Sequence, residues 1–186
     1  RYQTIVEIYG LLRFVCLTYL YNMTIILKNK DTLIYDEFMF KCCIGKKGLT
    51  ENKLEGDKKT PIGSFSLGNL FYRADRKQKP ITRLKLVKIK NNMGWCNDIK
   101  SKTNYNKLII KNKKLSYEKV FRNDYKYDFF LPIKYNWNNV KLGAGSAIFI
   151  HLTKNYKKTL GCIALKENDF LILLKLINKK TKIKVI

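Results

Sequence analysis

The sequence has few of the residues that bind metals or build disulfide frameworks. Its 186 residues include one histidine, His151, and five cysteines with no Cys-x-x-Cys pair among them. A four-ligand zinc site would need distant cysteines to converge on that single imidazole, so we predict no metal and no cofactor. The odd number of cysteines, without regular spacing, also argues against a disulfide framework.

Acidic residues are scarce as well. The chain has 14 Asp and Glu against 38 Lys and Arg, which gives a net charge of +24. Clustered positive charge suits nucleic acids, but these lysines are scattered, with no basic helix, zinc-finger spacing or aromatic-interleaved RNA-binding block. We therefore expect no nucleic-acid partner and keep a basic nucleic-acid-binding module as an alternative. A cationic surface equally suits a polymer that is rich in carboxylates.

The chain contains no confident membrane span. Residues 1–22 carry Arg13 within an apolar stretch and have no small-residue cleavage site, which makes them a poor signal peptide. We interpret 1–22 as an N-terminal extension, either a truncated leader or a stretch upstream of a true start at Met23. Residues 23–186 then form one domain, and a hydrophobic content of 46% is enough for a folded core.

Hydrophobic periodicity predicts strands through most of this domain. Alternating segments favour strands, and a single segment near the C-terminus has the spacing of an amphipathic helix. Glycine and proline in 45–63 indicate a loop, which we expect to support the site through turn chemistry without a catalytic step. The predicted strands are 23–28 and 32–45 as a hairpin, 84–89, 127–133, 147–150 and 181–186, and the predicted helix is 167–177. The fold class is therefore mostly β, a mixed β-sandwich with one or two helices.

The stretch 145–165 carries the chemistry. The apolar run 147–150 alternates like a buried strand and places His151 at its end. Cys162 follows Gly161, where the missing side chain lets a backbone approach closely and leaves peptide N–H groups free. An imidazole within hydrogen-bond reach of a thiol can take its proton and return it to a leaving amine, which is acyl transfer through a thioester. The alternative is a buried structural thiol beside a satisfied core histidine.

This stretch resembles the catalytic signature of the L,D-transpeptidase catalytic domain family. In that signature a histidine is followed by a loop and a Ser/Thr-x-Gly-Cys turn, which here is Thr-Leu-Gly-Cys at 159–162. Three further blocks resemble one bacterial branch of the family in order and spacing, namely 55–76, 94–98 and 135–151. The resemblance covers roughly 23–186 and implies the fold given above.

Two positions depart from the better-known branches. Leu160 stands where many members have a second histidine, and Ala164 stands where many have an arginine, so contacts assigned to those residues are not carried over. By position, the resemblance implies Cys162 as nucleophile, His151 as base, and the peptide N–H groups of Gly161 and Cys162 as oxyanion donors. It also implies that a backbone carbonyl orients the imidazole.

The resemblance also implies a substrate and a reaction. The partner would be a peptidoglycan tetrapeptide stem, which forms a cysteinyl thioester, releases D-alanine and passes its acyl group to an amine. A periplasmic or cell-envelope location follows from the family, and we expect a monomer. An L,D-carboxypeptidase or another cysteine peptidase, such as a sortase-like enzyme, would share the same pair of residues.

Two arginines are candidates for substrate binding. Arg73 and Arg76 lie beside aromatic residues and have the planar donor groups that hold a carboxylate with two hydrogen bonds. The alternative is an internal ion pair with Asp75 on a solvated loop.

Three further residues are candidates for the site. Trp95 is expected to line the pocket, and Thr159, in the turn before the nucleophile, is a candidate for a substrate contact. Cys96 is a rival nucleophile without a histidine nearby in the sequence.

Overall fold

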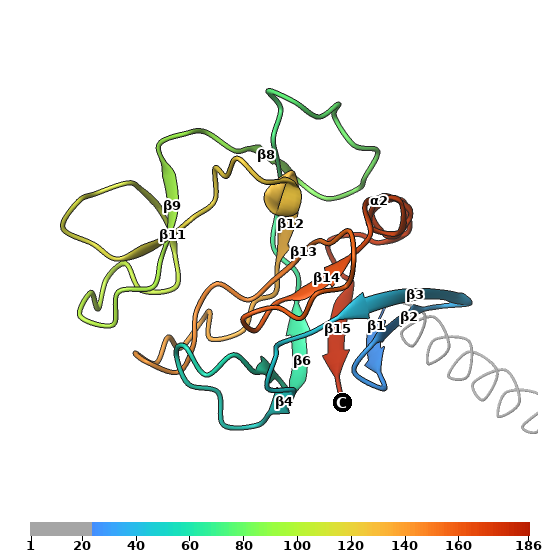
Figure 1. Cartoon of the computed structure of the whole chain (residues 1–186), viewed down its shortest axis with the longest axis horizontal. Helices are drawn as coiled ribbons and strands as arrows, with labels where there is room; N and C mark the ends of the chain where they lie inside the picture. Colours follow the sequence, from blue (N-terminus) through green and yellow to red (C-terminus); the bar gives the residue numbers. More distant parts are fainter. Residues whose placement is uncertain (1–23) are drawn as a thin grey trace, which may run out of the picture.

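A computed structural model describes residues 24–186 of the chain (Figure 1). The extension expected at 1–22 lies outside the described residues. Within 24–186, no helix is both long and apolar enough to cross a bilayer.

One large mixed sheet organises the domain. Its ten strands run in the order β6-β15-β1-β2-β3-β14-β13-β12-β7-β8, and the strands change direction along it, so that the sheet curls (Figure 1). The strands are β1 (Thr24–Lys28), β2 (Thr32–Tyr35), β3 (Phe38–Cys43), β6 (Gly63–Ser66), β7 (Leu70–Tyr72), β8 (Leu86–Lys88), β12 (Phe129–Pro132), β13 (Phe149–Leu152), β14 (Ile163–Leu165) and β15 (Lys182–Val185).

Smaller elements flank this sheet. A three-stranded sheet has the order β10-β9-β11 and lies on the opposite side of the molecule from the helix α2 in Figure 1, and β4 pairs with β5 in the loop before β6. Their bounds are β4 (Leu49–Thr50), β5 (Thr60–Pro61), β9 (Met93–Cys96), β10 (Leu108–Ile110), β11 (Tyr117–Lys119), the 3-10 helix η1 (Tyr125–Tyr127) and α2 (Glu167–Leu176).

The two faces of the central strands bury two hydrophobic clusters, because side chains alternate along each strand. The larger cluster lies between the sheet and α2, and it includes Ile150 from β13 and Phe170 from the helix. The second cluster is rich in aromatic residues and contains Phe149, Trp95 and Cys162. The proposed nucleophile therefore belongs to the face of the sheet that α2 does not cover.

The structure confirms the mostly β fold and most of the predicted elements. The helix and the C-terminal strand form where the periodicity places them. The first hairpin also forms, but the strand predicted at 32–45 is divided by a turn into β2 and β3, which pair with each other. The strand predicted at 147–150 is wrong by two residues, because Ala147 has a positive φ of 52° and the strand begins at Phe149. The sandwich is also built differently from the expectation, since one curled sheet supplies most of it.

Helix α2 offers a test of the larger core. Phe170 is 1% exposed and stacks on Phe129 at 6.4 Å between ring centroids, whereas Ile172 on the same helix is 41% exposed. We expect Phe170→Ala to lower the free energy of unfolding by about 3–5 kcal/mol, because it removes buried contacts and leaves a cavity. Ile172→Ala should change it by only about 0.5 kcal/mol. Urea denaturation of both variants measures the difference, and equal losses would show that α2 is not anchored through Phe170.

Candidate active site

The central pair of strands brings the histidine and the cysteine together. Strands β13 and β14 are parallel neighbours, with Ile150 opposite Ile163 and His151 opposite Ala164. Cys162 comes immediately before β14, so it lies two positions before Ala164 on the same face of the sheet as His151. The register therefore places both residues on one face, His151 within β13 and Cys162 one residue before β14.

The thiol of Cys162 is held by the backbone of the neighbouring chain segment. Its Sγ accepts a hydrogen bond from the Phe149 N–H at 3.3 Å and donates to the Ala147 carbonyl at 3.2 Å. The side chain is 9% exposed, and burial raises the pKa of the thiol to about 12. Cys162 is therefore a protonated thiol at neutral pH in the free protein.

A backbone carbonyl orients the imidazole. His151 Nδ1 lies 3.0 Å from the Leu152 carbonyl oxygen, so Nδ1 carries the proton and Nε2 is the free acceptor. The Tyr127 ring packs edge-on against the imidazole at 5.3 Å between centroids. Burial lowers the pKa of His151 to about 4, so the ring is neutral and able to accept a proton.

Hydrogen bonds fix the turn before the nucleophile. The Thr159 hydroxyl donates to the Cys162 carbonyl at 2.6 Å and accepts from the Gly161 N–H at 3.1 Å. The Gly161 carbonyl accepts from the Thr60 hydroxyl at 2.8 Å. Gly161 has a φ of 139°, which favours glycine at this position. The Thr159 hydroxyl and the Gly161 amide were both predicted to contact substrate, but in the structure they make hydrogen bonds within the turn.

A buried ion pair lies next to this turn. The side chain of Lys53 is 3% exposed, and its Nζ donates to Asp57 Oδ1 and to the Leu54 carbonyl, each at 2.7 Å. Sequence reasoning missed Lys53, because a lysine in a polar loop gives no sign of burial. The loop was expected only to support the site.

Two tyrosine–glutamate pairs also line this region. Tyr127 donates its hydroxyl hydrogen to Glu118 on β11, and Tyr105 donates to Glu55. The Tyr105 hydroxyl in turn accepts from the Gly145 N–H at 3.1 Å. Sequence reasoning missed these residues, because the contacts join segments far apart in the chain.

The tryptophan and the rival cysteine occupy different environments. Trp95 is 2% exposed and packs edge-on against Phe149 at 5.0 Å, in the same cluster as Cys162. Its indole Nε1 donates to Asn106 at 3.0 Å. Cys96, the next residue on β9, is fully buried and outside that cluster. Trp95 thus supports the proposed site from within the core.

The two arginines make their contacts within the protein. Arg73 forms a two-bond ion pair with Asp75 at 2.7 and 2.6 Å and lies over the Phe121 ring at 3.6 Å. Arg76 pairs with Asp128. These contacts confirm the ion-pair alternative for Arg73, and its role in substrate binding stays a prediction.

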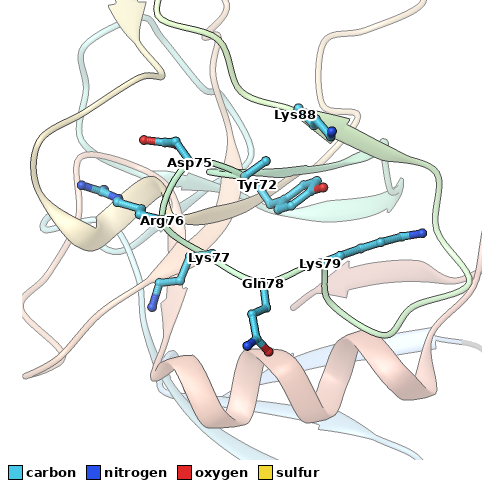
Figure 2. Close-up of a pocket in the computed structure, with 8 residues that line it drawn as sticks. Tyr72, Asp75, Arg76, Lys77, Gln78, Lys79 and Lys88 are labelled. Atoms are coloured by element: carbon cyan, nitrogen blue, oxygen red, sulfur yellow. The ribbon is translucent and has the colours of Figure 1, made fainter.

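Arg76 borders an open basic hollow, shown in Figure 2. Tyr72 forms its centre, Gln78 points toward α2, and Lys79 and Lys88 extend outward. Tyr72 belongs to the larger cluster on the face of the sheet that α2 covers, whereas Cys162 belongs to the other face. The hollow is therefore separate from the Cys162 environment.

Comparison with known proteins assigns the domain. The family model for the L,D-transpeptidase catalytic domain matches residues 20–185. The chain belongs to this family. A comparison with curated proteins finds no match. Within residues 24–186, no group of three or more His, Cys, Asp or Glu side chains is placed to hold a metal ion.

Two solved structures are similar to this L,D-transpeptidase domain. They are the helical cell shape determining protein Pgp2 from Campylobacter jejuni and a mutant of it. Both are 20% identical to the chain and cover 87% of it, with TM-scores of 0.45 and 0.46. The chain spans 46% of the length of each.

The depressed pKa of the buried histidine makes stability depend on pH. The unfolded chain binds a proton on this ring below its ordinary pKa of 6.5, whereas the folded chain binds it only near pH 4. Stability therefore falls as the pH drops through this window, by up to about 3 kcal/mol. We expect the difference in unfolding free energy between wild type and His151→Gln to shrink by about this amount between about pH 7 and pH 4. A difference that stays constant with pH would show that the folded protein protonates His151 normally.

Proposed function

We propose that this domain is a peptidoglycan L,D-transpeptidase in which Cys162 is the nucleophile and His151 the general base. The observation that carries the proposal is the placement of Cys162 and His151 on one face of two adjacent parallel strands. The Leu152 carbonyl leaves the imidazole Nε2 free to act as a base. Membership of the family supports the same chemistry.

In the first half-reaction a tetrapeptide stem would be the donor. Cys162 Sγ attacks the carbonyl before the terminal D-alanine, and its proton passes to His151 Nε2. The imidazolium then gives this proton to the departing nitrogen of D-alanine, so the C–N bond breaks and a thioester remains. Because the thiol and the imidazole are both neutral in the free protein, the proton moves from Cys162 to His151 during the attack on the carbonyl.

Peptide N–H groups would stabilise the oxyanion of this step. The Cys162 amide is the more direct donor, because the Gly161 amide already donates to Thr159. In the second half-reaction an amine from a neighbouring stem attacks the thioester, with His151 as its base. Water in place of the amine would give carboxypeptidase activity.

Mass spectrometry of the intact protein tests the nucleophile. We expect the wild type to form a covalent adduct with a tetrapeptide muropeptide and, separately, with a carbapenem, and to release D-alanine from the muropeptide. Cys162→Ala should form neither adduct. Cys96→Ala is the matched control, because it removes a second buried thiol and should react like the wild type. His151→Gln should slow acylation about 10²–10⁴-fold.

Two results would contradict the proposal. An adduct that survives in Cys162→Ala and disappears in Cys96→Ala would show that Cys96 is the nucleophile. No adduct and no released D-alanine from the folded wild type would exclude the acyl-transfer reaction. Product analysis with and without an amine-bearing acceptor stem then distinguishes transfer from hydrolysis.

A further inference from the structure

Lys53 has an unusual environment for a lysine in a cationic protein. Its side chain is buried, with Nζ bonded to Asp57 and to the Leu54 carbonyl. A buried ion pair is weak evidence for stability, because the cost of removing both charges from water offsets their attraction. Stability therefore gives little reason for burying Lys53, and we look for its role in its position relative to Cys162.

Lys53 fills the space between the two chain segments that flank the thiol. A Cβ on Gly145 would lie 2.7 Å from Lys53 Cγ, and a Cβ on Gly161 would lie 3.8 Å from Lys53 Cε. Gly145 begins the segment whose Ala147 carbonyl accepts the thiol hydrogen, and Gly161 immediately precedes Cys162. The Lys53 side chain thus packs beside Gly145 and lies near Gly161, which are on the two chain segments next to Cys162.

Glu118 brings the opposite charge to the same thiol. It lies on β11, opposite Trp95, and its carboxylate accepts the hydroxyl hydrogen of Tyr127. Tyr127 packs on His151 and shares the aromatic cluster with Cys162. Within residues 24–186, Glu118 forms no ion pair with a lysine or arginine. Burial raises the pKa of its carboxyl, and Arg122 partly opposes that shift.

The charged and titratable groups around the thiol act in different directions. Glu118 raises the pKa of Cys162, whereas the Phe149 N–H and Lys53 lower it. Asp57 is held by Lys53 and has no comparable effect on the thiol. The groups concerned are Lys53 and Asp57 from the loop before β5, Glu118 from β11, Tyr127 from η1 and His151 from β13, with Arg122 and Glu55 acting on Glu118.

We propose that Lys53, packed beside Gly145 and Gly161, and Glu118, bonded to Tyr127, are positioning residues of opposite charge that act on the reactivity of Cys162 in opposite directions. Lys53 stabilises the thiolate that forms during attack and keeps the two backbone segments apart. Glu118 disfavours the thiolate and adds to the effect of burial, which is the main reason why the thiol is protonated in the free protein. The role of these residues in catalysis rests on the proposed function, but their effect on the thiol does not.

The test measures thiol reactivity without any substrate. Iodoacetamide alkylates thiolates, and peptide mass mapping reports the rate at Cys162 separately at each pH. We expect Lys53→Met to slow alkylation of Cys162 about tenfold near pH 8 and Glu118→Gln to accelerate it about tenfold, which corresponds to one pKa unit in each direction. Lys53→Arg should restore a rate close to that of the wild type.

Matched controls separate charge from structural damage. Lys47→Met and Glu51→Gln remove the same charges at exposed positions, and both should leave the rate unchanged. The thiols of Cys42 and Cys96, which are 2% and 0% exposed, report unfolding in the same experiment, because they should stay unmodified in every folded variant.

A double variant addresses the ion pair itself. Lys53→Met leaves the Asp57 carboxylate without its cation, which is expected to lower the melting temperature. Adding Asp57→Asn removes that unpaired charge, so part of the stability should return. Alkylation of Cys162 should remain slow, because the cation that favours the thiolate is still missing. This variant also serves if Lys53→Met alone does not fold.

Opposite changes in the alkylation rate would support the proposal. It would be overturned if both variants shifted the rate in the same direction, or if the rates followed the melting temperature and returned to the wild-type value in the double variant. Carbapenem acylation measured in parallel keeps the two proposals apart. If the wild type reacts with neither carbapenem nor stem peptide, but the two variants still change the alkylation rate in opposite directions, the proposed function is wrong and the inference about Lys53 and Glu118 stands.

Discussion

The parallel pairing of β13 with β14 is the interaction on which the candidate site depends. It sets His151 and Cys162 on one face of the sheet, although a loop separates them in the sequence. The hydroxyls of Thr159 and Thr60 hold the chain as it enters β14, so the thiol reaches the Ala147 carbonyl in a defined position. A shift of one residue in this register would turn Cys162 toward the opposite core.

Burial of Cys162 and His151 determines their ionisation and the strength with which nearby charges act on them. Low polarity around Cys162 and His151 keeps both neutral, so the free protein holds a thiol and an imidazole instead of an ion pair. The same environment strengthens the effect of each fixed charge that remains nearby. Lys53 and Glu118 therefore have far more influence on this thiol than the many lysines on the surface, whose fields are screened by water and salt.

Several features could be predicted from the sequence because they depend on local patterns. Alternation predicted the N-terminal hairpin, helical spacing predicted α2, and the Thr-x-Gly-Cys turn pointed to Cys162. Predictions failed where a distant contact decides the structure. The chain at Ala147 adopts a positive φ that shortens the predicted strand. The Tyr105–Glu55 hydrogen bond, which joins segments 50 residues apart, was not predicted.

The sequence by itself determined the mostly β class, the position of the helix and the two candidate residues for acyl transfer, because periodicity and residue chemistry are properties of short segments. Only the tertiary structure decided which groups surround the thiol. Lys53 and Glu118 lie more than a hundred and more than forty residues before Cys162, respectively. Their distance from the thiol is set by how the sheet curls and how the loops pack on it, and no local pattern encodes that arrangement.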